Sequence, residues 1–260
     1  MFLIDVAGFE IWGERPHGEP APVFLSEGGF EGWDDTPEIR RSSIARVNGH
    51  GEFDADGFLT ARTASFSGQV VTGSKAQTAE LGRRLRGVLS YGQSGRVTVH
   101  RDELTEWADG RLAGSTKFTV HGSDPTVADW QMQLWFPDPR KYGQLNTEGP
   151  AAGGGPGVTI KHFGNTWAAS QLVIAGEDAN GYVLLGPSGR RIEVNLPLTP
   201  GNPHFVDTAT GQVSVAGSTK YGVLGEVDLW ETAPGKTTTV ALSNTASTNT
   251  VTVNTWDTYL

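Results

Sequence analysis

The chain has 260 residues, of which 35 are glycine and none is cysteine, and its formal net charge is −9. This length suits two domains, and the lack of cysteine excludes a disulfide framework, a thiolate nucleophile and a cysteine-ligated metal. Neither half is basic, which argues against a nucleic-acid-binding surface. The opening run Met1–Ile4 reaches Asp5 without a basic segment, and no apolar stretch approaches about 18 residues, so we expect neither a signal peptide nor a membrane span.

In the first half, short Thr-, Val- and Phe-rich segments separated by turns predict strands. These segments are Phe58–Val71, Arg96–His100, Ser115–Val120 and Asp129–Phe136. Every second residue from Trp130 to Phe136 is apolar, which predicts one core-facing side and leaves Trp135 on the other. Gly68 inside the first segment predicts a bulge or a close backbone approach.

One helix is predicted at about residues 75–90. Ser74 followed by Gln77 has the form of a capping box. Apolar residues then recur at helical spacing in one stripe, at Leu81, Leu85, Val88 and Leu89. The first half is therefore expected to be a sheet with one amphipathic helix packed on it.

A segment without large side chains, residues 149–157, predicts a Gly/Pro linker between a domain of residues 1–148 and one of residues 158–260. After it, short strands alternate with glycine and proline turns, which is typical of an antiparallel β-sandwich. The expected strands are Val158–His162, Ser170–Ala175, Tyr182–Leu185, Arg191–Leu196, His204–Asp207, Gln212–Ala216, Gly222–Trp230, Thr237–Ser243 and Asn249–Trp256.

The usual patterns of catalytic or cofactor-binding sites are missing. Asp54-Ala55-Asp56-Gly57 begins like a calcium loop, but the ligand series stops there. The six histidines, His17 among them, form no metal-binding pair in sequence, and no serine-nucleophile, phosphate-loop or dinucleotide motif occurs. Two carboxylate pairs, Asp34 with Asp35 and Glu226 with Asp228, could in principle serve a glycan hydrolase. We predict no catalytic residue, no metal and no cofactor.

Eight tryptophans leave a second possibility open. Exposed aromatic rings on a β-sandwich can stack on sugars, and the same rings can equally belong to a core or to a protein interface. Strand alternation would expose Trp135 and Trp230, and Trp167 is a further candidate. A carbohydrate-binding or host-recognition module is therefore the alternative hypothesis.

Several short motifs follow one another along the whole chain. In the first half they are Pro37–Arg40 with Asn48-Gly49-His50-Gly51, the strand from Arg62 to Gly68, and Phe136-Pro137-Asp138-Pro139-Arg140-Lys141-Tyr142. In the second half they are Gly164–Ser170, Asn202–Asp207, Leu229–Thr237 with its Pro234-Gly235 pair, and Trp256–Tyr259. In this order they resemble the distal tail proteins of siphophages, especially those of phages that infect actinobacteria. The segment ending at Tyr142 is the most telling.

The resemblance implies a mainly β chain, with a ring-forming "belt" β-sandwich that carries one helix and a galectin-like antiparallel β-sandwich. It implies a homohexameric ring at the distal end of a phage tail, made in the host cytoplasm. Its partners would be the tail tube protein, the tape measure protein and the tail-associated hub protein. A host glycan is a further expected partner only under the alternative hypothesis.

Overall fold

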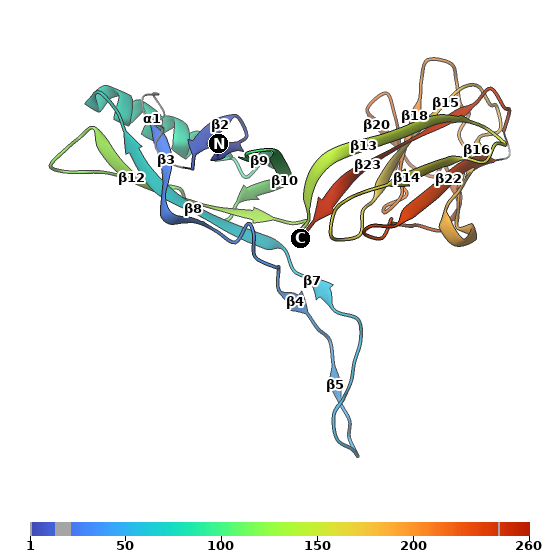
Figure 1. Cartoon of the computed structure of the whole chain (residues 1–260), viewed down its shortest axis with the longest axis horizontal. Coiled ribbons are helices and arrows are strands. Elements are labelled where there is room, and N and C mark those ends of the chain that lie inside the picture. Colours follow the sequence, from blue (N-terminus) through green and yellow to red (C-terminus); the bar gives the residue numbers. More distant parts are fainter. Residues whose placement is uncertain (1, 14–21, 244) are drawn as a thin grey trace. The chain divides into compact units, whose positions relative to one another are not determined.

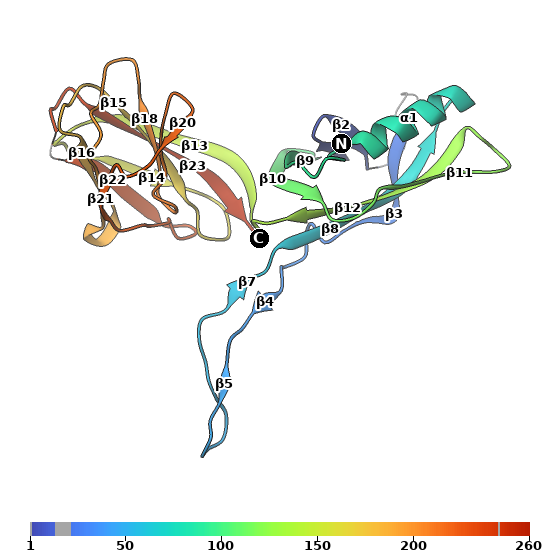
Figure 2. The same cartoon turned by 180° about the vertical axis from the view of Figure 1, so that it is seen from behind.

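The computed structural model describes residues 2–13, 22–243 and 245–260, and the chain is mainly β, as predicted. It divides into two compact units, Met1–Lys141 with Leu260 and Tyr142–Tyr259. Each unit encloses a hydrophobic core of its own. His17, one of the six histidines, lies outside the described residues. Figures 1 and 2 show the elements from opposite sides.

Eight strands of the first unit are hydrogen-bonded in the order β11-β12-β8-β3-β2-β1-β9-β10. Because β10 also pairs with β12, the strands from β12 to β10 form a closed series. These pairs are antiparallel, except for the parallel contact between β2 and β3. The strands are β1 (Phe2–Val6), β2 (Phe9–Trp12), β3 (Val23–Glu31), β8 (Arg62–Val71), β9 (Gly95–Arg101), β10 (Leu104–Leu112), β11 (Lys117–Val120) and β12 (Val127–Phe136).

Strand β12 has the predicted alternation, with Trp130 and every second residue to Phe136 buried. It pairs along its whole length with β8, where Gly68 lies opposite Trp130. A Cβ atom at Gly68 would lie 1.9 Å from the carbonyl oxygen of Phe24 on β3. Glycine is therefore required here because β3 approaches the backbone of β8 closely, as the sequence predicted.

Helix α1 (Lys75–Gly87) begins where its capping residues predict, because the Ser74 hydroxyl accepts a hydrogen bond from the Gln77 backbone N–H. It ends before Ser90 because Val88 is already extended. Leu85 and Leu89 of the predicted stripe are buried, and Leu81 and Val88 are partly buried against the same core. The helix packs against β11 and β8, and Figure 2 shows it beside β11.

Between β3 and β8 the chain forms a long two-stranded arm of residues 38–60 (Figure 1). Its paired segments are β4 (Ile39–Arg40) with β7 (Phe58–Leu59) and β5 (Ile44–Ala45) with β6 (Glu52–Phe53). The single strand predicted over Phe58–Val71 is therefore two strands. Thr60 N–H donates to Glu38 O in the arm, whereas β8 pairs with the sheet from Arg62 onward.

The second unit is a sandwich of two sheets around the second core. One sheet runs β13-β23-β15-β18-β19-β20 and the other β14-β22-β16-β17-β21. The bounds are β13 (Lys141–Ala152), β14 (Val158–Lys161), β15 (Ser170–Ala175), β16 (Tyr182–Leu185), β17 (Arg191–Val194), β18 (His204–Asp207), β19 (Val213–Val215), β20 (Ser218–Lys220), β21 (Leu224–Val227), β22 (Thr237–Ser243) and β23 (Thr250–Tyr259), with a 3-10 turn at Pro187–Gly189.

The Gly/Pro segment expected as a linker has a different place in the structure. The division between the units falls after Lys141, and residues 149–152 belong to strand β13. A Cβ at Gly149 would lie 2.9 Å from Val251 O, and one at Gly157 would lie 2.4 Å from Val240 O. Small residues occur in this segment because neighbouring backbone approaches closely, so the expectation of a free linker is corrected.

Candidate interaction sites

Arg62 joins two of the sequence motifs of the first unit. Its side chain is buried, and its Nη1 atom donates to the carbonyl oxygens of Gly32, Trp33 and Asp35 at 2.6 to 3.0 Å. Its Nε atom donates to Pro139 O at 2.9 Å. The start of β8 and the motif that ends the unit are therefore held by one guanidinium group.

A network of charges surrounds this junction. Arg101 binds Asp34 through two hydrogen bonds, of 2.8 and 2.5 Å, which lower the pKa of that carboxyl. The Lys141 Nζ atom lies 3.6 Å from Glu106 Oε2. Burial lowers the pKa of this ammonium group, although the negative charges of Glu106 and Asp34 favour its charged form. Trp33 donates its indole N–H to Glu106. The carboxylates of Asp34 and Glu106 are therefore both bound by neighbouring basic or indole side chains.

Asp138 and Arg140 shape the turn that precedes the second unit. The Asp138 carboxylate accepts hydrogen bonds from the Arg140 backbone N–H, at 3.1 Å, and from its guanidinium, at 3.0 Å. The next residue, Lys141, is buried and belongs to the charge network around Arg62, and Tyr142 is the first residue of the second unit. In the second unit, Pro234 and Gly235 occupy the centre of a turn closed by Lys236 N–H on Ala233 O, with Gly235 at φ +68°.

The arm carries His50 and Gly51 at its tip, where Arg46 N–H donates to Gly51 O. Gly51 has φ +88°, which only glycine adopts readily. The arm exposes an unusual set of large apolar side chains: Ile39, Ile44, Val47, Phe53, Phe58 and Leu59. Exposed apolar side chains gathered in this way are typical of surfaces that contact another macromolecule or a membrane.

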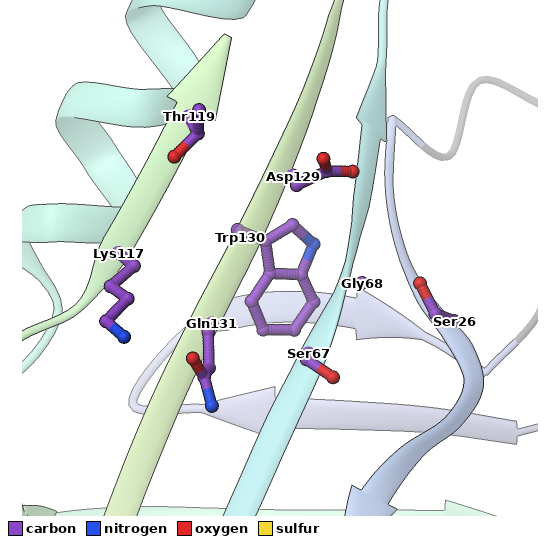
Figure 3. Close-up of a pocket in the computed structure, with 8 residues that line it drawn as sticks. All are labelled: Ser26, Ser67, Gly68, Lys117, Thr119, Asp129, Trp130 and Gln131. Carbon is purple, nitrogen blue, oxygen red and sulfur yellow. The ribbon is translucent and has the colours of Figure 1, made fainter. Parts of the chain in front are cut away.

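A polar hollow of about 400 Å³ lies on the first unit, over β11, β12, β8 and β3 (Figure 3). Lys117 and Asp129 line it with Ser26 and Ser67. Asp129 is engaged by His121 at 2.9 Å and by Gln69 at 3.0 Å. Figure 3 shows the Trp130 indole beside Gly68, and no acceptor for its N–H lies in the described part of the chain. Asp129, the one acidic side chain among the lining residues, is therefore already bound by two neighbouring side chains.

The three tryptophans considered for surface contacts differ. Trp135 and Trp167 are 40% and 55% exposed, whereas Trp230 is 2% exposed. The prediction for Trp230 as a surface ring is wrong, because β21 ends at Val227 and its alternation does not continue. Trp230 packs over Gly186, where a Cβ would lie 2.7 Å from the ring.

The remaining candidate carboxylates and histidines do not come together in one site within the described residues. Glu226 forms a 3.5 Å ion pair with Arg191, next to Asp228 on an exposed edge. Across residues 2–13, 22–243 and 245–260, no cluster of three His, Asp or Glu side chains could hold a metal ion. No helix among them is long and apolar enough to cross a membrane.

Solved structures share this architecture. The SPP1 Dit protein (gp 19.1), described as a paradigm of the hub adsorption apparatus in phages that infect Gram-positive bacteria, matches with a TM-score of 0.71, 14% identity and 100% coverage of both chains. The chain has the fold of the SPP1 Dit protein. Two structures of the activated phage P2 baseplate, with Ca and with Sr, match with TM-scores of 0.50 at 8% and 9% identity. They cover 83% and 97% of this chain, and 86% and 97% of their own. No family model and no curated protein sequence matches.

Proposed function

We propose that the protein is a structural component of a bacteriophage tail baseplate, a distal tail protein without catalytic activity. The observation that carries this proposal is the Dit-type fold, matched over the full length of both chains. The order of the sequence motifs along the chain is a second support. The location would be the distal end of a virion tail, after synthesis in the host cytoplasm.

In this proposal the first unit builds a homohexameric ring that joins the tail tube to the tail-associated hub, around the tape measure protein. Rings arise from heterologous contacts whose rotation closes. The arm is suited to such a contact, because it carries exposed apolar residues along a two-stranded hairpin with unpaired edges. The second unit, the galectin-like domain, would decorate the outside of the ring.

Negative-stain electron microscopy with sedimentation analysis tests the ring. The wild-type protein, alone or co-produced with the tube and hub proteins of its virion, should give annular particles of six subunits. The double variant Phe53→Asp, Phe58→Asp should remain monomeric with an unchanged circular dichroism spectrum, since both side chains are exposed in the arm. Tyr221→Asp, at an exposed aromatic of the second unit, is the matched control and should still form rings.

A wild-type protein that stays monomeric in both preparations would overturn the ring. Rings that form equally well from the Phe53/Phe58 variant would remove the arm from the interface and leave the rest of the proposal in place.

A further inference from the structure

The second unit has a hollow of about 420 Å³ in its surface, within the range of roughly 300–1,000 Å³ that small ligands occupy. It is lined by Trp167, Arg190, Ala209, Leu229, Trp230 and Glu231. We propose that this hollow binds a neutral saccharide, with a pyranose ring stacked on Trp167. The proposed structural role of the chain does not require such a site.

Trp167 is exposed, yet its backbone is held on both sides. Thr166 N–H donates to Thr258 O at 3.2 Å, and Ala168 exchanges two hydrogen bonds with Thr232, of 3.0 and 2.8 Å. The ring is therefore presented from a fixed segment, so binding would not require the loop to become ordered. Such preorganisation lowers the entropic cost of binding.

The segments that carry the other lining residues are also held by hydrogen bonds. The backbone N–H of Trp230 donates to Thr208 O at 3.0 Å, and the backbone N–H of Asp228 donates to Arg191 O at 2.7 Å. The Arg190 guanidinium donates to Leu229 O, which holds it at the rim of the hollow. The buried indole N–H of Trp230 has no acceptor within the described ranges. That nitrogen is buried below the surface, so the polar contacts to a ligand would come from Arg190 and Glu231.

These groups match a neutral sugar. The face of an indole carries negative charge density, which attracts the weakly positive C–H groups of a pyranose ring. The Arg190 guanidinium can donate to hydroxyl oxygens, and the Glu231 carboxylate can accept from hydroxyl groups. The positive charge of Arg190 and the negative charge of Glu231 offset each other, so the lining has no net charge that would select a phosphate or an acidic sugar. Leu229 extends the apolar part of the wall.

A glycan array of neutral and acidic oligosaccharides, probed with the full-length protein, tests the site. The wild type should bind one or more neutral glycans. Trp167→Ala should weaken that binding at least tenfold, measured by isothermal titration calorimetry with the best neutral glycan. Glu231→Gln should weaken it several-fold. Trp135→Ala, which removes an exposed tryptophan of the first unit, is the matched control and should bind within twofold of the wild type.

Three results would overturn the proposal: no glycan bound by the wild type, binding only to acidic glycans, or full binding by Trp167→Ala with an unchanged circular dichroism spectrum. If Trp167→Ala instead disrupts assembly with another tail protein while the wild type binds no glycan, the surface is a protein interface. Ring formation is measured separately, so failure of the glycan site leaves the ring proposal standing.

Discussion

Arg62 shows how one buried side chain can hold distant parts of a β unit. Its guanidinium satisfies carbonyl oxygens in the segment 32–35 and at Pro139, which lie on either side of β8 in sequence. Lysine carries the same charge but cannot reproduce the planar fork of donors. The sequence motif around Arg62 is therefore explained by geometry and needs no catalytic role.

We expect Arg62→Ala to lower the free energy of unfolding by about 3 kcal/mol, because it removes the donor of four carbonyl groups, of which one is buried and three are partly buried. Arg62→Lys should cost less than the alanine variant. Urea unfolding followed by circular dichroism measures both. Arg83→Ala, at an exposed position paired with Glu80, should change stability by less than about 0.5 kcal/mol. Equal losses at the two arginines would contradict this account.

His204 makes the stability of the second unit depend on pH. Its side chain is buried with the Tyr182 hydroxyl 3.1 Å from Nδ1, and burial lowers the pKa of its imidazole. The unfolded chain, whose histidine titrates near pH 6.5, then takes up a proton before the folded protein does as pH falls. This contribution to stability is complete above about pH 6.5 and declines below it, by at most about 1.4 kcal/mol per pH unit.

Thermal unfolding from pH 7.5 to 5.5 checks the prediction for His204. The decline in Tm should be smaller in His204→Gln than in the wild type, since glutamine does not titrate. Burial also raises the pKa of Tyr182, which keeps that phenol neutral throughout this range. An identical pH dependence in the two proteins would assign the decline to other groups.

Helix α1 offers two glycines in contrasting surroundings. A Cβ at Gly82 would lie 2.6 Å from the Phe118 ring of β11, whereas nothing lies within 4 Å of one at Gly87. Gly82→Ala should therefore destabilise the protein by about 1–3 kcal/mol through overpacking. Gly87→Ala should be neutral or stabilise by up to about 1 kcal/mol, because alanine favours a helix. Denaturant unfolding measures both, and two changes of the same sign would contradict the docking of α1 through Gly82.

The elements that local patterns specify were predictable from sequence. The Ser74 cap and the alternation of β12 depend on neighbouring residues, and both are present in the structure. The last residues of strand β13, Gly149–Ala152, are not predictable as a strand because they lack side chains with strand preference and are held by close packing against distant backbone. Trp230 was misplaced because the end of β21 leaves no signal in alternation. The role of Arg62 cannot be predicted from sequence, because it depends on two segments that only the fold brings together.

At the scale of the whole molecule, the chain has two cores, and each draws its residues from one unit. Leu134 is fully buried in the first core and Leu184 in the second. Truncating either leucine to alanine should cost about 2–5 kcal/mol, because it removes apolar contacts and leaves a cavity.

The loss should appear in the unit that contains the cavity. Hydrogen exchange measured by mass spectrometry should accelerate in β15, β16 and β22 of Leu184→Ala, with β8 and β12 unchanged, and the reverse pattern should hold for Leu134→Ala. Each variant is the control for the other, since both remove the same atoms from a buried site. Acceleration in both units of one variant would show that the two cores unfold together. Separate responses would mean that the first unit can keep its stability while the surface of the second varies.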